Sequence, residues 1–404
     1  MVRDSSVGVV GCGFAGAATA LFLARAGHRV TVYERVAEPT AVGAGILLQP
    51  TGLAVLARLG LLEQVVARGA RVEGLRCHTA RGKALFDLEY ADLHPRLFGL
   101  GIHRGALFEA LYGALEPAGV RVECGRAIDG LDPVLEEHDL AIVAEGSRSE
   151  LRRVSPEHAR SKPYGWGALW FVGRDPECRF GQYLSQVCEG TGRMLGFLPT
   201  GLGPGGGSVP LVSLFWSLRM DTVDAWRQRG LAAWKNDILD YAPHAEALLA
   251  QIEDAEQVLT ASYVDGVMRR WHERARPVVY VGDAAHSMSP QLGQGTNLAL
   301  VDAAVLADCI ANASELPAAL ADYSARRRAH VRFYQFASRW LTPLFQSDHE
   351  WLTPLRDVLM PIATRVAPLR AQMVRTLTGV KRGVVRRSLP LTPLVETLAL
   401  PAPK

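Results

Sequence analysis

A glycine-rich turn close to the N-terminus constrains the fold of this chain more than any other feature. The apolar run Val7–Val10 leads into the motif Gly-Cys-Gly-Phe-Ala-Gly at Gly11–Gly16, and a segment of helical composition follows. In such a strand–turn–helix unit Gly11 permits the tight turn, Gly13 lets a ligand phosphate approach the backbone, and Gly16 lets the helix pack closely on the strand. The helix N-terminus adds free N–H groups and a partial positive charge, which favour an anion here.

A second strand and an acidic residue complete this unit. The helix expected over Ala15–Ala26 should end at Gly27 in a left-handed conformation, and Arg29–Tyr33 is predicted to be a strand. Glu34 ends that strand, and an acid about 20 residues after the glycines can bind the ribose hydroxyls of an adenosine. The unit therefore predicts a dinucleotide site. NAD and FAD are both open on this motif alone, whereas NADP is disfavoured because an acid repels a 2′-phosphate.

The rest of the chain divides into further units. At 404 residues it is long enough for two or three packed domains. Segments rich in aromatic residues and turns, as between Gly165 and Leu218, indicate an antiparallel sheet inserted as a second domain. Trp226–Leu259 and Tyr323–Leu377 are predicted to be helical, the latter broken by prolines at 343, 354, 361 and 368. Apolar runs and spacing predict further strands and helices: strands at Val120–Glu123, Leu140–Ala144 and Pro277–Val281, and helices at Leu53–Gly69, Leu107–Leu115 and Asn297–Ile310.

Composition argues against several classes of function. The net charge of +3 is too small to indicate a nucleic-acid partner. The six cysteines show no CxxC spacing, so we expect no metal site and no disulfide framework, and each cysteine is expected to be a small buried residue in a reducing, cytoplasmic setting. The N-terminal apolar stretch is interrupted by glycines and preceded by charges, which argues against a signal peptide, and no run of about 18 apolar residues predicts a transmembrane helix.

A second glycine-rich segment carries a longer and more specific motif. After the predicted strand Pro277–Val281, the range Gly282–Asn297 reads Gly-Asp-Ala-Ala-His-Ser-Met-Ser-Pro-Gln-Leu-Gly-Gln-Gly-Thr-Asn. Glycines leave the backbone bare against a flat ring, and a helix N-terminus at Asn297 can stabilise negative charge. With the N-terminal unit, this segment resembles the group A FAD-dependent aromatic monooxygenases, the p-hydroxybenzoate hydroxylase-like family that includes salicylate and ubiquinone-pathway hydroxylases.

The resemblance implies cofactor contacts residue by residue. It places Asp283 on the FAD ribityl chain and Pro290 beside the isoalloxazine ring, where it shapes the flavin-side pocket. Gly43–Pro50 resembles the stretch whose backbone lies near the flavin, and Gly125–Ile128 resembles the strand that meets the adenine. Arg104 resembles the FAD-binding arginine of the family, although a surface arginine at a helix start is an alternative. The residues expected to bind FAD are Gly11, Gly13, Phe14, Ala15, Gly16, Glu34, Arg35, Gly45, Ile46, Arg104, Ile128, Asp283, Pro290, Gly293, Gly295, Thr296 and Asn297.

Two residues in these motifs are open to more than one interpretation. The family usually has an Asp-Gly pair after its next strand, a motif that serves both FAD and the nicotinamide cofactor, and here that pair is Glu145-Gly146. The extra methylene of Glu145 is either a tolerated exchange or a change in the nicotinamide role. His286 could act as a base, but its place in the FAD loop favours a structural hydrogen bond.

The resemblance also implies a reaction. NADPH or NADH would reduce FAD transiently, O2 would add to give a C4a-hydroperoxyflavin, and an aromatic or lipophilic small molecule would be hydroxylated, with no metal involved. The aromatic, weakly charged sheet supports such a substrate. Trp166 and Trp170 are expected in the core, and Arg193 and Arg219 are candidates for binding an acidic substrate, with surface roles equally open. The alternatives are a non-hydroxylating FAD oxidoreductase, such as a double-bond reductase or an epoxidase, and a catalytically inert flavin-binding protein.

We therefore predict an α/β fold with a Rossmann-like FAD-binding domain, an inserted antiparallel-sheet substrate domain and a helical C-terminal region. The FAD-binding domain is expected to comprise residues 1–75, 98–160 and 272–330, the substrate domain residues 76–97 and 161–271, and the C-terminal region residues 331–404. The basic, leucine-rich C-terminal region is expected to form a helical cover, and a peripheral contact with a membrane surface is left open.

Overall fold

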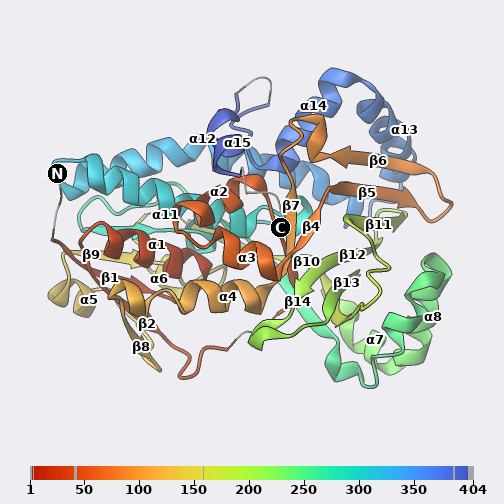
Figure 1. Cartoon of the computed structure of the whole chain (residues 1–404), viewed down its shortest axis with the longest axis horizontal. Helices are drawn as coiled ribbons and strands as arrows, with labels where there is room; N and C mark the ends of the chain where they lie inside the picture. The colour runs from red at the N-terminus through yellow and green to blue at the C-terminus, as the bar shows by residue number, and fades with distance from the viewer. Residues whose placement is uncertain (1, 3, 41–42, 158, 385–386, 399–404) are drawn as a thin grey trace.

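A five-stranded parallel sheet forms one end of the molecule (Figure 1). The computed structural model describes residues 2, 4–40, 43–157, 159–384 and 387–398. Parallel strands buried on both faces are continuous apolar runs, which is why the short runs in the sequence identified them. The predicted strands are confirmed, in the spatial order β15 (Val278–Tyr280), β9 (Leu140–Val143), β1 (Ser6–Val10), β2 (Arg29–Glu34) and β8 (Arg121–Cys124).

Helices cover this sheet and contribute to the same core. The predicted first helix is α1 (Phe14–Arg25), and Gly27 has the expected left-handed backbone, with φ of 91°. It packs against α11 (Gly295–Asn312), which also contacts α2 (Pro50–Arg58) and α12 (Leu316–Phe345). The single helix predicted over Leu53–Gly69 is wrong: Gly60, with φ of 62°, separates α2 from a second helix, α3 (Leu62–Arg68). The predicted helix at Leu107–Leu115 is α4 (Arg104–Tyr112).

A seven-stranded sheet forms the other end, and the predicted antiparallel sheet is confirmed within it (Figure 1). Neighbouring strands are antiparallel except β11 and β5, which are parallel. The predicted helical stretch Trp226–Leu259 contains α8 (Leu231–Tyr241) and α9 (Glu246–Leu249), and α7 (Val223–Arg229) begins slightly before it. The strand order is β14 (Leu259–Met268), β10 (Ala159–Arg174), β13 (Pro210–Arg219), β12 (Arg193–Leu202), β11 (Tyr183–Glu189), β5 (Gly74–Thr79) and β6 (Ala84–Glu89).

The two faces of this sheet have different neighbours because side chains alternate along a strand. On β10, Leu169 and Phe171 join the core that includes Trp234 and Ile238 of α8. Trp170, between them, is half-buried and packs against the core of the parallel-sheet region; Trp166 is also half-buried, so the expected core position of the two tryptophans holds only in part. The predicted residue boundaries of the two domains stay a prediction, although β5 and β6 do lie in the same sheet as β10 to β14.

A small third sheet, which the sequence did not reveal, connects the two regions. It has the order β3 (Gly45–Leu48), β7 (Gly99–His103) and β4 (Ala70–Val72). The backbone N–H of Gly45 donates to Ser213 Oγ of β13 at 2.7 Å. A Cβ atom on Gly101 would lie 1.8 Å from the carbonyl oxygen of Pro199, so a glycine is needed where β7 crosses β12.

Helices make up most of the C-terminal region, as predicted. After α12 come α13 (Leu352–Arg365), α14 (Ala367–Thr378) and α15 (Thr392–Thr397). The prolines interrupt the helical stretch only in part: it breaks after Pro343 and before Pro368, whereas Pro354 lies in the first turn of α13. Pro343 lies in the last turn of α12, Pro361 lies inside α13, and Pro368 lies in the first turn of α14, where proline is well tolerated.

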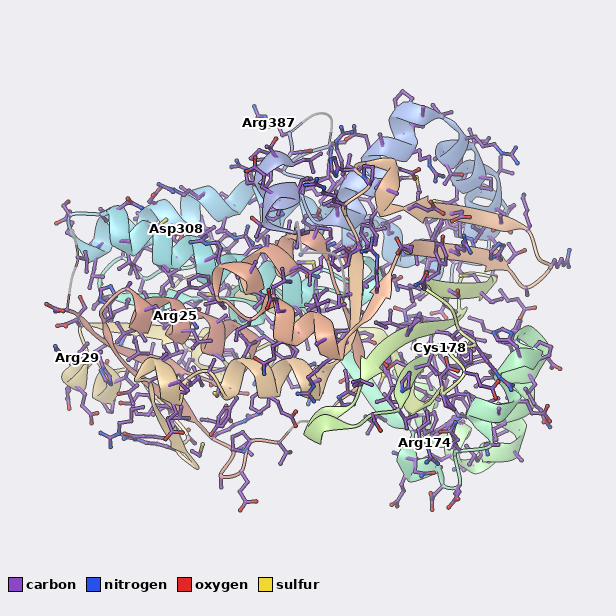
Figure 2. The ribbon with its side chains drawn as sticks, viewed as in Figure 1. Arg25, Arg29, Arg174, Cys178, Asp308 and Arg387 are labelled. Carbon is purple, nitrogen blue, oxygen red and sulfur yellow. The ribbon has the colours of Figure 1, made fainter. Side chains whose placement is uncertain are left out.

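The cysteines lie mostly where the sequence placed them. All six are free, and Cys12, Cys77, Cys188 and Cys309 are buried. Cys178 is exposed on the seven-stranded side of the molecule (Figure 2), so the expectation of burial is wrong for this residue. Among the helices that the structure describes, none is both long enough and apolar enough to cross a membrane.

Candidate active site

The three glycines of the N-terminal motif differ in what surrounds them. Gly11 has φ of 103°, and a Cβ atom there would lie 2.6 Å from the carbonyl oxygen of Ala144. A Cβ atom on Gly16 would lie 1.9 Å from the Gly11 carbonyl oxygen, so both positions require glycine for packing. Gly13 is different, because a Cβ atom there would meet no described atom within 4 Å. Gly13 therefore faces open space, as expected if a ligand approaches the backbone at this point.

Glu34 lies beside this turn. Its carboxylate accepts the backbone N–H of Cys12 at 2.8 Å and that of Val36 at 3.0 Å. The turn at Gly125 joins the same corner, because the N–H of Arg126 donates to the Glu34 carbonyl at 2.9 Å. Glu34 and the turn at Gly125 thus lie side by side, while Arg35 is exposed and Ile128 is half-buried; their contacts with an adenosine stay a prediction.

The second glycine-rich segment meets the first one directly. A Cβ atom on Gly282 would lie 2.8 Å from the Cβ of Ala15, next to the start of α1. Asp283 begins the short helix α10 (Asp283–His286), and its Oδ1 atom is 3.8 Å from the Cβ position of Gly295 at the start of α11. Burial raises the pKa of Asp283, and the nearby charges of His286, Arg104 and Arg152 oppose that rise.

A buried carboxylate holds this loop in place. Asp302 of α11 accepts the N–H of Gly282 at 2.9 Å, His286 Nε2–H at 2.5 Å and Arg327 Nε–H at 2.6 Å. Burial alone would raise the pKa of Asp302, but the charges and hydrogen bonds of His286 and Arg327 outweigh it and lower the pKa. Arg327 also donates to Nδ1 of His330, whose pKa burial and Arg327 lower, so that ring is neutral. The predicted structural hydrogen bond of His286 is therefore confirmed.

Arg104, which resembles the FAD-binding arginine of the family, lies beside Phe14 of the first glycine-rich motif and beside Gly43. Its guanidinium carbon is 5.2 Å from the ring centre of Phe14, and its Cδ atom is 2.9 Å from the Cβ position of Gly43. The side chain is exposed, and no described acid forms an ion pair with it. A cation in this position is available to an anionic ligand that lies along the Gly11–Gly16 turn.

Asn297 and Gln49 join the loop before α11 to the end of β3. Asn297 is fully buried; its Oδ1 atom accepts the N–H of Gln49 at 2.8 Å, and its Nδ2 atom donates to the carbonyls of Leu47 and Gly293. The amide of Asn297 is thus occupied by protein groups, and α11 begins at Gly295, two residues earlier than predicted. Gln49 accepts from Tyr90 Oη at 2.5 Å, but its buried Nε2 atom has no partner among the described residues.

The remaining predicted contacts lie at the rim of the same region. Pro290 is exposed and starts a single 3-10 turn that ends at Gly293, which has φ of 59°. Thr296 is half-buried on the first turn of α11, and Ile46 is half-buried on β3, where it pairs with Ile102. The structure thus gathers the predicted residues along one path, from the Glu34 corner past Gly13 to the start of α11.

Glu145 has a local structural role that the sequence did not show. Its Oε2 atom accepts Ser149 Oγ–H at 2.5 Å and the N–H of Leu151 at 3.1 Å, which caps α6 (Glu150–Arg153). The buried Arg152 of α6 donates to the carbonyls of Ser147 at 2.6 Å and Asp283 at 2.9 Å. The longer acid therefore helps to fix a helix whose arginine supports the Asp283 loop. The signal for this role in the sequence is an arginine, Arg152, soon after the Glu145-Gly146 pair.

Aromatic side chains gather on the sheet face that turns toward the parallel-sheet region. The Trp170 and Phe215 rings are 5.2 Å apart, and Trp170 Nε1–H donates to Tyr263 Oη at 3.4 Å. Burial raises the pKa of Tyr263 to about 12. The arginines considered for an acidic substrate lie elsewhere: Arg219 pairs with Asp221 and Asp348, and Arg193 pairs with Glu189, all on the surface.

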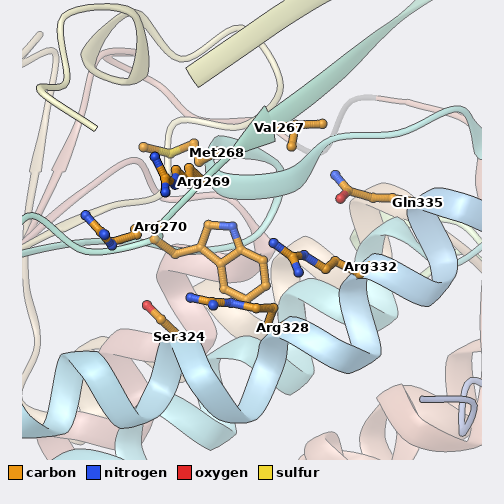
Figure 3. Close-up of a pocket in the computed structure, with 9 residues that line it drawn as sticks. Val267, Met268, Arg269, Arg270, Ser324, Arg328, Arg332 and Gln335 are labelled. Carbon is orange, nitrogen blue, oxygen red and sulfur yellow. The ribbon is translucent and has the colours of Figure 1, made fainter. Parts of the chain in front are cut away.

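A separate cavity of about 80 Å³ lies between the end of β14 and α12 (Figure 3). Trp271 is among the lining residues, and Arg269 and Arg270 lie on one side with Arg328 and Arg332 on the other. Only Arg270 has an ion-pair partner among the described residues, Glu157 at 3.3 Å. The described residues contain no cluster of three or more side chains suited to a metal ion.

These observations fit FAD at the junction of α1, α10 and α11. Gly13 has an open face, and Arg104 has no ion-pair partner among the described residues. The buried Gln49 Nε2 atom, 3.9 Å from the Cβ position of Gly293, has no hydrogen-bond partner among them either, and a buried donor without a partner is rare in proteins.

Comparisons with known proteins agree with this assignment. The FAD binding domain family matches residues 4–152 and 137–334. The 2-heptyl-3-hydroxy-4(1H)-quinolone synthase of Pseudomonas aeruginosa is 27% identical over 92% of this chain and 97% of its own length. The 6-hydroxynicotinate 3-monooxygenase of Pseudomonas fluorescens is 27% identical over 87% and 95%, respectively. The structure of Klebsiella pneumoniae HpxO complexed with FAD and uric acid superposes with a TM-score of 0.74 at 21% identity, covering 94% of this chain and 98% of that one, which shows a common fold.

The matched family spans well over half of the chain and both glycine-rich motifs. The named relatives include several monooxygenases of aromatic compounds, in line with the group A resemblance. The chain belongs to the FAD binding domain family and is a FAD-dependent monooxygenase of the group A type.

Proposed function

We propose that this enzyme uses NADPH or NADH and O2 to hydroxylate an aromatic or lipophilic small molecule. The observation that carries the proposal is the convergence of Ala15, Gly282 and Gly295 around Asp283, although these residues are up to 280 positions apart in the chain. This junction places two helix N-termini and an acid next to the open face of Gly13. Such a site favours a phosphate-bearing cofactor with hydroxyl groups to bind.

We propose specific roles for the residues of this site toward FAD. Gly13 and the start of α1 would receive the pyrophosphate together with Arg104, and Glu34 would hold the adenosine ribose. Asp283 would accept hydroxyl groups of the ribityl chain, and Gly293 would lie against the ring. When bound, the flavin supplies the redox chemistry and the activation of O2.

The protein itself would position the substrate and exclude water. The aromatic face formed by Trp170, Phe215 and Tyr263 gives an apolar wall that suits a flat ring. Because the pKa of Tyr263 is raised to about 12, its hydroxyl remains protonated at neutral pH and can donate a hydrogen bond. That wall would orient the ring and keep bulk water away from the reactive position.

The relatives indicate which aromatic compounds to test first. Their names specify a 4(1H)-quinolone and a nicotinate, and one structural neighbour holds uric acid. All three are nitrogen heterocycles, and the quinolone carries a heptyl chain. We therefore place hydroxylated nitrogen heterocycles with an apolar substituent first among the candidate substrates.

The arginine-lined cavity supports a docking place for the anionic reductant. Val267 lines this cavity. The N–H of the preceding residue, Gly266, donates at 3.0 Å to the carbonyl of Ser287, which lies in the second glycine-rich segment. Arginine binds phosphate groups well. The variant Arg328→Glu is expected to raise the KM for NADPH or NADH about tenfold without a change in FAD content. An unchanged KM would show that NADPH or NADH does not bind in this cavity.

The main test is a spectrum followed by anaerobic reduction. Purified protein should show flavin absorbance, and one compound from a panel of phenols, pyridines and quinolones should accelerate reduction by NADH or NADPH and be hydroxylated when O2 is admitted. Bound flavin that no compound accelerates would favour the non-hydroxylating or inert alternatives. Protein that cannot be reconstituted with FAD would contradict the proposal.

A single variant tests the proposed ribityl contact. Asp283→Ala should be purified largely as apoprotein, because the carboxylate that would bind the FAD hydroxyls is lost. The control is Asp308→Ala. It removes an exposed carboxylate from α11, the helix that begins at Gly295. Normal holoenzyme from Asp283→Ala would disprove this placement.

A further inference from the structure

Helix α13 shows the reverse of the usual burial pattern of a surface helix, because an arginine is buried and apolar side chains are exposed. Its buried arginine, Arg356, points inward, where it donates to the carbonyls of Gly190 at 2.6 Å and Leu344 at 3.0 Å. Exposed apolar side chains follow this helix and its two ends instead: Leu355, Val358, Leu359 and Ile362 lie in α13, Trp351 and Val366 flank it, and Leu369 lies in the first turn of α14, each between 42 and 70% exposed. We call these seven residues the α13 face.

Such a face is not explained by the fold itself. A helix on the surface of a globular protein normally buries its apolar stripe and exposes charges. Within α13, all of which the structure describes, Arg365 is the single exposed charged residue. Contiguous exposed apolar patches mark sites of contact with another molecule or with a membrane. The helix lies at an outer corner of the molecule beside β6, far from the parallel sheet, where a flat surface can reach it (Figure 1).

Charge distinguishes between the surfaces that could cover this face. Residues 351–384 contain a single acid, Asp357, which is paired with Arg356 at 2.8 Å. Arg365 is exposed at the end of α13, whereas Arg375 and Arg382 are half-buried further along the chain; none of the three has a described acid within ion-pair distance. A second copy of the chain in a two-fold contact would set this cationic surface against itself. An anionic lipid surface complements both the apolar side chains and the cations.

We propose that the α13 face binds the surface of anionic lipid bilayers, with Trp351 and the leucines in the interfacial layer and Arg365 among the headgroups. Tryptophan is enriched at this depth in membrane proteins. The inference goes beyond the proposed function. Only its link to a substrate rests on that function: a lipophilic aromatic substrate partitions into bilayers, so attachment would bring the enzyme to its source.

The test is co-sedimentation of the full-length holoenzyme with lipid vesicles. Vesicles of phosphatidylcholine with phosphatidylglycerol should bind the wild type, and the double variant Leu359→Glu/Ile362→Glu should bind about tenfold less, because it places two acids on the face. The control is Leu259→Glu, the same type of change at an exposed leucine of the edge strand β14, which should bind like the wild type. The FAD absorbance of each variant checks that it is folded.

The outcomes separate this inference from its rivals. Wild type that stays in solution with these vesicles, or a double variant that binds as well as wild type, would overturn the proposal. A wild-type dimer that the double variant dissociates, without vesicle binding, would assign the face to a second copy. If the double variant loses FAD, Arg365→Glu provides the same test with a single surface change. Vesicle binding needs no turnover, so a failed hydroxylation assay would leave this result intact.

Discussion

The hydrogen bonds around Asp302 give the sharpest quantitative prediction. The Asp302 carboxylate accepts three hydrogen bonds, from Gly282, His286 and Arg327. In Asp302→Asn these three donors would meet a neutral amide whose nitrogen is itself a donor. Arg327 is only 3% exposed, so its charge would lose its buried counterion. Removing one partner of a buried ion pair typically costs about 3–5 kcal/mol, a large part of the roughly 5–15 kcal/mol by which proteins are stable.

The assay is urea unfolding of the apoprotein, with a matched variant on the same helix. Asp308 pairs with Arg58 at 2.6 Å, but both side chains are more than 40% exposed, and Asp308 lies in the other half of the molecule from Cys178 (Figure 2). Asp308→Asn should therefore cost only about 0–1 kcal/mol. Because the N–H of Gly282 precedes Asp283, we also expect Asp302→Asn to bind FAD more weakly. Equal losses for the two variants would refute the reasoning.

The pH dependence of this difference follows from the lowered pKa of Asp302. A carboxyl whose pKa is lower in the folded than in the unfolded chain stabilises the fold fully above the unfolded value, about 3.9, and loses that contribution as the pH falls through the folded value. The contribution of the Asp302 carboxylate to the stability difference between wild type and Asp302→Asn should thus be complete at about pH 5 and shrink below about pH 4. A difference that grows under acid would contradict the assignment.

Further predictions concern single residues. Gly16→Ala should prevent a stable N-terminal unit, because its Cβ would lie 1.9 Å from a carbonyl oxygen, whereas Gly13→Ala should leave apoprotein stability unchanged and weaken FAD binding; thermal melts and flavin titration distinguish the two. Arg104→Ala should weaken FAD binding by about 1.5–3 kcal/mol in a fluorescence titration. An unchanged affinity would show that Arg104 is a surface residue that does not bind FAD. Glu145→Asp should keep its FAD but be reduced by NAD(P)H at a different rate in stopped-flow experiments, and an identical rate would exclude a nicotinamide role. Thiol titration should show one fast cysteine, lost in Cys178→Ser, and a fast phase that survives would contradict its exposure.

The sequence predicted the parts of the structure that depend on local chemistry. The turn at Gly11 and the left-handed Gly27 follow from backbone conformations that few residues other than glycine adopt. The parallel strands are apolar runs with no competing pattern. The gathering of Asp283 beside the first motif was also predicted, but through the resemblance to a family and not from spacing alone.

The features that the sequence did not reveal depend on distant partners. The neighbouring sequence does not distinguish a glycine that a helix tolerates from one that ends it. Gly60 ends a helix because the chain turns there. Asp302 and Arg327 lie on two different helices, and an apolar period gives no sign of a buried charged pair between them. Arg152 donates a hydrogen bond to the carbonyl of Asp283, which is 131 positions away in the chain. The outward apolar face of α13 has the same period as an inward one, so the sequence could not say which way it points.

The central place of β1 in the parallel sheet has a consequence for synthesis on the ribosome. The strand β9 that pairs with it ends at Val143, yet the next strand on that side, β15, starts only at Val278. At roughly 5–20 residues per second, the nascent chain would wait about 7–27 seconds with the apolar edge of β9 unpaired. Contacts of such sequence separation also make folding slow. The enzyme's yield in a host cell should therefore depend on chaperones that shield this edge until the seven-stranded sheet has been made.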